Sequence, residues 1–587
     1  LYSAHKNYDM VQNHMQLAIN GLVEYFEILH MDFNAKKCNI LVVSRKKNND
    51  PNLQYFIKDQ CLPVVDTIKV LGIYIDNKLT FKTHINSILQ QCWKDLNILK
   101  SVSCRTQGAH PEFILQIYKS VIRSKLDYGC FLYGHSTKTE LNKIDNLQNQ
   151  ALRIALGAFK SSPIVTLHAE ASVMPLNLRR QLLADRVVYK IVSQNNHPAY
   201  TSLMYLSSIY TDMQYWANKR VPLFLQSLNN ISQININIIT DVVFKNIWDF
   251  DEPLFLINRK VKPTSNAFIL DNKIIKNQQN ENVTKQIVRD KLNITFKDYI
   301  RVYTDGSKSV EGVGSAFWIP QLNISAKYTL NKYSSSYTAE LVAILKSIQH
   351  ISNLNNNDFI ILTDSQAAVI AIEKSMEGSN NDNQSIIITI VYEILVTKKN
   401  IIIQWIPGHI GIAGNEKVDS LAKEAITDGI RLVEFNIPFD DFKAYQKILY
   451  HAKFNEYFLG SNKAKWYKQI VDSVPKQSWF KNVKFKRWEI VNLLRLRVGH
   501  ANTNSSLFTI GKYFTPLCLR CTLGNNETLE HIFFRCPAND HARSTNFKLI
   551  SKQFGLNNVN LCRVLQTNDS QIFKELNSFL VAIKRRI

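Results

Sequence analysis

Four acidic residues between positions 305 and 419 constrain the fold most, because each lies at an end of an expected strand or helix. Asp305 and Asp364 each follow a short β-branched and apolar stretch typical of a strand. Glu340 lies at the start of a helical pattern, and Asp419 lies one turn into another. Two strand ends and two helix starts can meet at one edge of a sheet. For Asp305 alone the simpler alternative is a turn, because Asp-Gly commonly closes a strand.

Four converging carboxylates require cations, because like charges close together raise one another's pKa. Ligation by oxygen alone suits magnesium or manganese. A pair of such ions, about 3.5–4 Å apart, can hold the attacking water and the leaving oxygen of a phosphodiester. The acidic residues therefore favour metal-dependent hydrolysis of a phosphodiester without a protein nucleophile.

Residues 297–428, which contain these acids, resemble a type-I ribonuclease H domain. The segments that carry the resemblance are Thr-Asp-Gly-Ser at 304–307, Thr-Ala-Glu-Leu at 338–341, Thr-Asp-Ser at 363–365, Trp-Ile-Pro-Gly-His at 405–409 and Asn-Glu-x-x-Asp-x-x-Ala at 415–422. The resemblance implies that Asp305, Glu340, Asp364 and Asp419 bind two Mg²⁺ (or Mn²⁺) ions. It also implies that His409, on a glycine-rich loop, assists cleavage or product release.

Hydrophobic periodicity within this domain predicts three meandering strands, followed by strands that alternate with helices. The expected strands are 299–304, 312–319, 322–330, 358–363 and 400–405, and the expected helices are 337–350, 365–374, 385–398 and 415–426. These elements predict a mixed five-stranded sheet with flanking helices. The chain as a whole is expected to be a multi-domain α+β and α/β protein.

The balance of charge indicates a polyanionic partner. The 587 residues include 71 basic and 48 acidic side chains, a net charge of +23, which beside a phosphodiesterase-like site favours nucleic acid. We expect an RNA–DNA hybrid, with single-stranded RNA or DNA as a further candidate. No apolar run reaches the roughly 18–20 residues of a membrane span, and no signal peptide is evident. We therefore expect an intracellular protein, nuclear or cytoplasmic, with no membrane partner.

The chain before the ribonuclease H-like domain resembles the second half of a reverse transcriptase from jockey-like and I-element-like non-LTR retrotransposons. The segments that carry this resemblance are Phe33-Asn-Ala-Lys-Lys-Cys38, Val70-Leu-Gly-Ile-Tyr-Ile-Asp76, 79–85, 152–158 and 175–180. The resemblance implies the end of a palm and thumb over 1–105 and a helical thumb or connection region over 106–200. Because the chain begins at Leu1, the family's paired metal-binding aspartates are missing. We expect a C-terminal fragment of the polyprotein without polymerase activity.

Periodicity predicts helices over 9–30, 85–99 and 111–195, and a strand over 39–44. Residues 201–296 are weakly patterned and are expected to form a loosely structured connector. Basic residues on the expected helices can contact phosphates, or can equally form a solvated helix face. These residues are Lys119, Arg123, Lys125, Arg153, Arg179 and Arg180.

Residues 429–510 are expected to form a helical region rich in lysine and tryptophan. Trp466, Trp479 and Trp488 can stack on bases beside basic residues, and the alternative is that they fill a helical core.

Residues 511–587 contain Cys518, Cys521, His531 and Cys536 in the spacing C-x2-C-x9-H-x4-C. Three thiolates and an imidazole form the closed ligand set of structural zinc, so we expect a Zn²⁺ site, with coincidence as the alternative. The segment around His531 also resembles the cysteine–histidine motif near the C-terminus of the same retrotransposons. Cys562 is left over and is expected to be buried.

The sequence therefore predicts endonucleolytic hydrolysis of the RNA strand of RNA–DNA hybrids by a two-metal mechanism, within a retrotransposon-derived polypeptide. A second hypothesis is a catalytically inactive remnant that binds nucleic acid through its basic and zinc-binding regions. A third, a DNA transposase or integrase with a similar sheet, is disfavoured by the Thr-Ala-Glu-Leu helix and the Pro-Gly-His loop.

Overall fold

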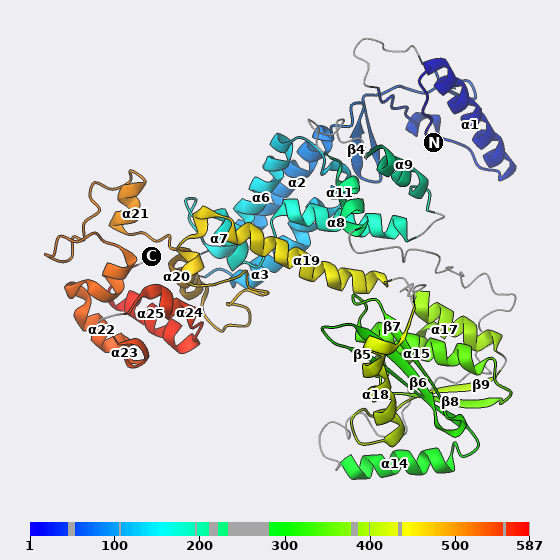
Figure 1. Ribbon diagram of the computed structural model, residues 1–587. Coiled ribbons are helices and arrows are strands. Elements are labelled where there is room, and N and C mark those ends of the chain that lie inside the picture. Colours follow the sequence, from blue (N-terminus) through cyan, green and yellow to red (C-terminus); the bar gives the residue numbers. More distant parts are fainter. Residues whose placement is uncertain are drawn as a thin grey trace. The chain divides into compact units, whose positions relative to one another are not determined.

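The structure of the protein is a computed structural model (Figure 1). It describes residues 1–44, 53–104, 107–193, 197–210, 221–232, 281–376, 385–397, 399–432, 437–555, 559–585 and 587. The chain divides into two compact units. The first consists of Leu1–Ala184, Asp212–Gln226 and Tyr450–Ile587, and the second of Asp185–Thr211 and Ser227–Leu449. The sequence of the second unit is therefore inserted into that of the first.

The N-terminal part of the first unit combines one long helix with two small hairpins. Its elements are α1 (Tyr8–Ile28), η1 (Ala35–Lys37), β1 (Phe56–Ile57), β2 (Gln60–Cys61), β3 (Thr67–Val70) and β4 (Ile73–Asp76). The strand expected over 39–44 is wrong, because that segment forms only an isolated bridge between Ile40 and Val64. The run 68–76 is a hairpin: Leu71 and Gly72 both have positive φ, as a two-residue turn between paired strands requires. The basic stretch 45–47 lies outside the described residues.

The next part of the first unit is helical, as the sequence predicted. Its elements are α2 (Lys82–Ser101), α3 (Pro111–Ile117), the π-helix η2 (Tyr118–Arg123), α4 (Ser124–Asp127), α5 (Cys130–Tyr133), α6 (Lys138–Leu156), α7 (Ile164–Glu170) and α8 (Leu176–Val192). Their apolar faces form one core that includes Ile85, Leu96, Ile122 and Leu147. In the region expected to be a loose connector, the described residues form three helices, α9 (Tyr200–Tyr210), α11 (Leu223–Ser232) and α14 (Glu281–Ile294).

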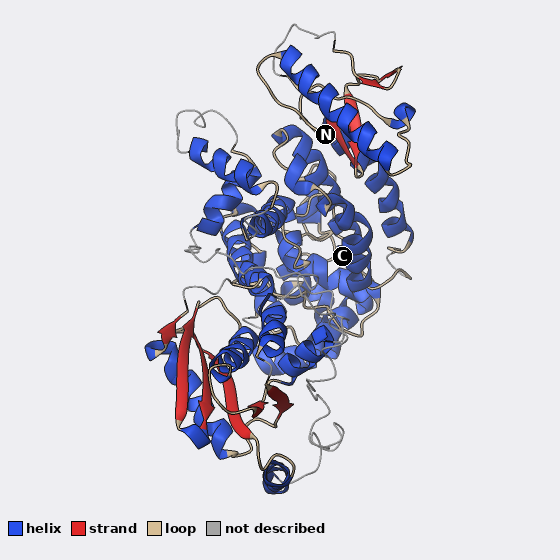
Figure 2. Cartoon of the chain, turned by 90° about the vertical axis from the view of Figure 1, so that its right-hand side faces the viewer, coloured by secondary structure: helices blue, strands red, loops and turns tan. Residues whose placement is uncertain are grey.

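The second unit is organised around a mixed sheet, which is red in Figure 2. Its strands are β5 (Ile300–Lys308), β6 (Val313–Ile319), β7 (Ile324–Leu330), β8 (Asp358–Thr363), β9 (Asn400–Trp405) and β10 (Ile430–Arg431), in the order β10-β7-β6-β5-β8-β9. Strands β5, β6 and β7 pair antiparallel, and β5, β8 and β9 pair parallel. The expected five-stranded sheet is thus extended by β10, a two-residue strand parallel to β7.

Side-chain alternation along the strands divides the second unit into two hydrophobic layers. The helices of this unit are α15 (Ser336–Ile351), α16 (Gln366–Met376), α17 (Ser385–Val396) and α18 (Ala413–Asp428), with a short η4 (Pro320–Leu322). Phe359 and Ile361 of β8 pack with α15, α16 and α17 on one face. Ile360 and Leu362 pack with α14 and α18 on the other face. Helix α14, which precedes the expected domain boundary, therefore contributes Val288 to the core of this sheet.

The chain after the sheet returns to the first unit. Its elements are α19 (Phe439–Leu459), η5 (Asn462–Ala464), η6 (Tyr467–Gln469), α20 (Arg487–Val498), α21 (Asn504–Thr509), η7 (His531–Arg535), η8 (Pro537–Asn539), α22 (Asp540–Asn546), α23 (Lys548–Phe554), α24 (Leu561–Gln566) and α25 (Ser570–Ala582). Ile490 and Leu494 of α20 pack into the core formed by α2 to α7. Trp466 donates its indole N–H to the Leu496 carbonyl, and Trp479 donates its own to the Glu170 carboxylate. These two tryptophans are therefore packing residues of the first unit.

Within the described part of the chain, no helix has both the length and the apolar character that crossing a membrane requires.

Candidate active site

The structure brings three of the four predicted acids together at the centre of the sheet. Asp305 lies in β5, Asp364 directly follows β8, and Glu340 lies near the start of α15. Each can offer one carboxylate oxygen such that these oxygens all lie within 4.8 Å of one another. Pairing of β5 with β8 stops at Thr304 and Thr363, so the two aspartates directly follow the last paired residues of these neighbouring strands. Strand β5 does not end at Asp305, however, because β6 continues to pair with it as far as Lys308.

Gly306 allows the helix that carries Glu340 to approach β5. A Cβ atom at Gly306 would lie 2.4 Å from the backbone nitrogen of Glu340 and 2.7 Å from the Ala339 side chain. Ser315 on β6 fixes the same approach, since its hydroxyl donates to the Ala339 carbonyl at 2.8 Å. Packing against α15 thus requires glycine after Asp305, inside strand β5.

Burial and mutual repulsion make the three carboxyl groups hard to ionise. Burial, and then the charges of Asp364 and Asp419, raise the pKa of Asp305 to about 6. Burial, followed by the charge of Asp305, raises the pKa of Glu340 well above its ordinary value. Burial also raises the pKa of Asp364. One oxygen of Glu340, Oε2, is buried and has no hydrogen-bond partner among the described residues. A cation among these oxygens would offset both the cost of burying the carboxylate charges and their mutual repulsion.

Asp419 stands apart from this group of three. Its carboxylate forms an ion pair with Lys423, four residues further along α18, with 2.6 Å between Oδ2 and Nζ. It is nevertheless close enough for its charge to raise the pKa values of Asp305 and Asp364. The structure thus places Asp419 near the group of three, with its carboxylate held by Lys423.

Two residues that sequence reasoning did not assign to the site hold Asp364. Asn415, at the start of α18 and 3% exposed, hydrogen-bonds to the Asp364 side chain and thereby opposes the rise in its pKa. Trp405, at the end of β9, donates its indole N–H to the Asp364 carbonyl at 3.0 Å. The Asn-Glu-x-x-Asp pattern contained the signal for Asn415, since a residue four positions before Asp419 shares its helix face.

His409 lies on the loop between β9 and α18, next to Asp364. Its side chain is exposed, and its charge lowers the pKa of Asp364. The backbone of His409 has a φ of 58°, which is the left-handed region that few residues other than glycine adopt. A Cβ at the preceding Gly408 would lie 2.7 Å from Asp364 Oδ2, so glycine is needed there for the loop to pass this close. The loop geometry keeps His409 at the edge of the acidic group.

Asp441, on the first turn of α19, holds the start of α15. It is 5% exposed and accepts hydrogen bonds from the Ser335 backbone N–H at 2.8 Å and the Thr338 hydroxyl at 2.7 Å. Ser335 in turn caps the helix by accepting from the Thr338 N–H at 3.1 Å. The elements that position Glu340 therefore extend beyond residue 428.

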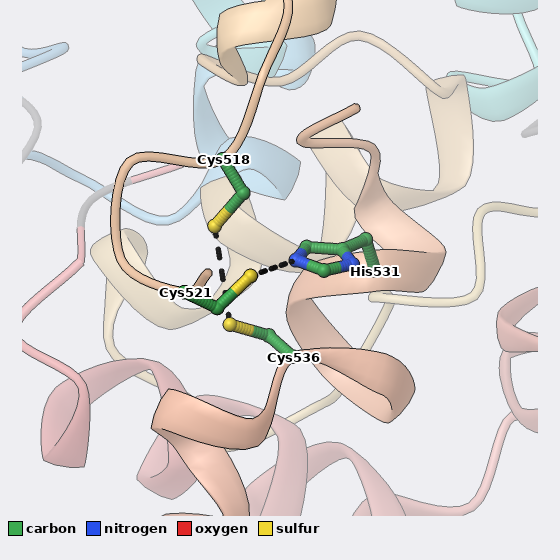
Figure 3. Close-up of side chains that lie close together, drawn as sticks. All are labelled: Cys518, Cys521, His531 and Cys536. Carbon is green, nitrogen blue, oxygen red and sulfur yellow. Dashed lines mark hydrogen bonds between the residues drawn. The ribbon is translucent and has the colours of Figure 1, made fainter. Parts of the chain in front are cut away.

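The four predicted zinc ligands also converge, in the first unit (Figure 3). Cys518 and Cys536 sulfurs lie 3.9 Å apart, and Cys521 Sγ lies 3.5 Å from His531 Nε2. Zinc bonds of about 2.3 Å to sulfur and about 2.0 Å to nitrogen would place tetrahedral ligands roughly 3.5–3.8 Å apart, close to what is seen. Burial first, and then the nearby thiols, raise the pKa of Cys536 to about 12. This crowded set of thiols fits a zinc ion. Cys562 is buried, as expected.

Comparisons with known proteins identify the family of the domain that holds these acids. Residues 297–427 match the family described as RNase H. Among solved structures, RNase H1 from the halophilic archaeon Halobacterium salinarum NRC-1 is 21% identical, covers 22% of this chain and 99% of that chain, and has a TM-score of 0.18. Residues 297–427 are thus a ribonuclease H domain.

Three curated relatives are RNA-directed DNA polymerases of mobile elements. That from mobile element jockey of Drosophila melanogaster is 27% identical over 188 residues, which is 31% of this chain and 20% of that protein. The probable enzyme from transposon X-element of the same species is 25% identical over 145 residues, 24% of this chain and 15% of that protein. The jockey enzyme of Drosophila funebris is 26% identical over 148 residues, 24% of this chain and 16% of that protein.

The chain thus spans a fifth or less of the length of these relatives. It is related to the reverse transcriptases of jockey-like non-LTR retrotransposons and carries a ribonuclease H domain, as its motifs predicted.

Proposed function

We propose that the ribonuclease H domain hydrolyses the RNA strand of RNA–DNA hybrids endonucleolytically. The observation that carries the proposal is the convergence of Asp305, Glu340 and Asp364, whose ligand oxygens lie within 4.8 Å of one another on the central strands. In the reaction, the oxygen of a water molecule bonds to phosphorus while the bond to the 3′ oxygen breaks. The products are a 3′-hydroxyl, which takes up a proton, and a 5′-phosphate.

Magnesium, or manganese in its place, fits these residues because every donor is a carboxylate oxygen and because Glu340 Oε2 is buried without a partner. Asp305, Glu340 and Asp364 would hold two ions, with Asp419 joining them on release from Lys423. Divalent cations bound there neutralise the carboxylates and stabilise negative charge on the phosphoryl group.

The residues around the acids have supporting roles in this proposal. Asn415 opposes the rise in the pKa of Asp364, because its hydrogen bond favours the carboxylate. His409, which is exposed beside Asp364, is placed to exchange a proton with the product before release. In this proposal Asn415 and His409 thus act on Asp364, one by a hydrogen bond and the other by its charge.

Cleavage of a labelled RNA–DNA hybrid by the full chain tests the proposal. We expect Mg²⁺-dependent cutting of the RNA strand alone, and its loss in Asp364→Asn. Asp428→Asn is the matched control, because Asp428 is an exposed acid on α18 that pairs with Lys327 and lies outside the site. Cutting of duplex DNA would instead support a transposase-like or integrase-like activity.

A second candidate function, a catalytically inactive nucleic-acid-binding remnant, is favoured by one observation. Lys423 occupies Asp419, the fourth acid, with an ion pair. A folded wild-type chain that binds the hybrid but does not cut it, in Mg²⁺ or Mn²⁺, would support this function and reject hydrolysis. Cutting that increases in Lys423→Ala would show instead that Lys423 competes with the metal for Asp419.

We also propose that Cys518, Cys521, His531 and Cys536 hold a structural zinc ion. This proposal is supported by the distances between their sulfur and nitrogen atoms, which are close to those of tetrahedral zinc ligands. Zinc bound there would stabilise residues 511–528, which form neither helix nor strand and have one isolated β-bridge, between Leu517 and Asn526.

A further inference from the structure

A basic pocket of about 650 Å³ lies in the first unit, between the end of α6 and α20. Its wall carries four positively charged side chains, Arg153, Lys160, Arg487 and Arg495, and no acidic one. This volume lies within the range of roughly 300–1,000 Å³ that is usual for ligand sites. The pocket therefore combines room for a ligand with charge of a single sign.

Three segments of the chain line the pocket: Ser103, residues 150–160 and residues 487–495. Arg487, Val491 and Arg495 follow one another at four-residue intervals and so share one face of α20. Arg153 lies near the end of α6, and Lys160 lies in the turn after it. The pocket exists only when the C-terminal region is folded onto the earlier helices.

Arg487 is buried without an acidic hydrogen-bond partner. It is 4% exposed, and its guanidinium donates to the carbonyls of Ser103, Ala109, Ile154 and Ala155 at 2.9–3.3 Å. Burial lowers the pKa of Arg487 to about 10. Carbonyl groups satisfy its N–H groups but do not neutralise its charge.

Capping of α6 explains part of this arrangement. Ile154 and Ala155 belong to the last turn of α6, and Arg495 donates to the carbonyl of the adjoining Gly157 at 2.8 Å. Arg495 also donates to the carbonyl of Ile587 at 2.6 Å. A helix C-terminus carries a charge of only about −0.5, which offsets a small part of the positive charges of Arg153, Lys160 and Arg487. Moreover, the Nε of Arg153 is buried and has no hydrogen-bond partner in the described part of the chain. Capping therefore leaves positive charge in excess.

Other basic residues on these helices are held by carboxylates. Arg123 and Arg179 both pair with Asp127, Lys125 pairs with Asp95, and Arg180 pairs with Asp145. These ion pairs favour a structural role for the four basic residues.

The pocket residues differ from that group. Among the described residues, Arg153, Lys160 and Arg487 form no ion pair with an aspartate or glutamate. The pocket thus gathers three basic side chains that no aspartate or glutamate of the described residues neutralises.

We propose that this pocket binds backbone phosphates of a polynucleotide strand, with Arg153 and Lys160 as the contacting side chains. Guanidinium groups match the geometry of phosphate oxygens, and the flexible ammonium of lysine adds charge. Arg487 and Arg495 hold α20 against the end of α6, and they add positive electrostatic potential to the pocket. The site lies in the first unit and is independent of the ribonuclease H chemistry in the second.

Binding of a fluorescent 20-nucleotide single strand to the full chain, measured by anisotropy across a salt series, tests this site. Every protein in this experiment also carries Asp364→Asn, and the buffer contains no added Mg²⁺, so that no strand is cut. The variants are Arg153→Gln, Lys160→Gln and the double variant. The matched control is Lys138→Gln, which removes one exposed charge at the other end of α6. Lys160 is exposed, so its variant tests the site without disturbing the core.

The plot of log K against log salt has a negative slope. Each lost phosphate contact should make this slope shallower by roughly 0.7 and should weaken binding roughly fivefold at 0.1 M salt. The double variant should therefore bind roughly 25-fold more weakly, and its slope should be shallower by roughly 1.4. Lys138→Gln should bind as the parent does. Unchanged affinity, or weaker binding with an unchanged slope, would reject the proposal.

Competition by inorganic phosphate and by ATP separates a strand site from a site for small phosphorylated molecules. Millimolar ATP or phosphate that raises the melting temperature of the parent, but not of the double variant, while both bind the strand equally, would overturn the proposal. Competition that weakens strand binding only in proportion to ionic strength would support it.

Discussion

Arg497 and Glu170 form an ion pair in which Nε and Oε1 are 2.8 Å apart, although 327 positions separate the residues in the chain. Both side chains are almost inaccessible, at 1% and 0% exposed. Trp479 donates to the same carboxylate, and Arg497 also donates to the Leu565 carbonyl at 2.9 Å. The pair joins α7 to α20 inside the first unit. In the sequence, the ribonuclease H domain lies between these two helices.

Arg497→Met should destabilise the first unit by about 3–5 kcal/mol, because it leaves the Glu170 carboxylate buried without its cation. Hydrogen exchange on the full chain would measure this effect as lost protection in α7 and α20, with β5 as the internal reference. The double variant Arg497→Met, Glu170→Gln should recover part of the protection, since no buried charge is then left unpaired. Unchanged protection in α7 would contradict a stabilising pair.

Gly306→Ala should abolish metal-dependent cleavage of the hybrid. The added Cβ would meet backbone atoms, the Glu340 nitrogen at 2.4 Å and the Ala339 carbonyl carbon at 2.6 Å, so α15 must move away from β5. Overpacking of this kind costs about 1–3 kcal/mol, and it would carry Glu340 away from Asp305. Gly312→Ala is the matched control, because its Cβ would meet the flexible Ile426 side chain at 3.1 Å and the Ile426 carbonyl oxygen at an ordinary 3.9 Å. Full activity in Gly306→Ala would show that the close approach of α15 is dispensable.

His168 should make the first unit less stable in mild acid. Its ring is enclosed between Gln148, 3.2 Å from Nε2, and Tyr457, 3.4 Å from Nδ1. Burial, with a smaller effect of Arg153, lowers the pKa of His168 from 6.5 to about 3, so the folded protein keeps the imidazole neutral. Between these values the unfolded chain binds the additional proton, and the free energy of unfolding rises with pH by up to about 1.4 kcal/mol per unit.

The contribution of His168 is thus complete above pH 6.5 and is lost as the pH falls towards 3. Melting temperatures between pH 5 and 7.5 should depend less steeply on pH in His168→Gln than in the parent. His541→Gln, at an exposed histidine of α22, is the control and should leave the slope unchanged. Equal slopes in all three proteins would exclude His168 as the cause.

The ribonuclease H domain could be predicted well from the sequence because its signals are local. Strand alternation and helical periodicity placed β5 to β9 and α15 to α18 within a few residues of their observed bounds. The two-residue β10 has no such periodicity, so the sixth strand could not be foreseen. The order of the motifs likewise predicted that Asp305, Glu340 and Asp364 lie together. The pairing of Asp419 with Lys423 could not be predicted, because it depends on side-chain conformations that sequence patterns do not determine.

The packing of the C-terminal region on the earlier helices could not be predicted. Arg487 donates to carbonyls more than 300 positions earlier in the chain, and no local pattern encodes such a contact. The lysine-rich stretch around Trp479 suggested base stacking as one alternative, yet its indole N–H is bound by Glu170. Local periodicity thus identified α20 as a helix but not its partner.

Zinc content should depend on Cys536 and not on Cys562. Both thiols are buried, and burial raises both pKa values to about 12, so the two cysteines differ chiefly in their neighbours. Only Cys536 lies with Cys518, Cys521 and His531. The parent chain and Cys562→Ser should each carry about one zinc per chain by elemental analysis, and Cys536→Ser should carry much less, because a closed structural site needs all four ligands. Equal zinc in the two serine variants would mean that the metal is held elsewhere, and its absence from the parent would reject the site.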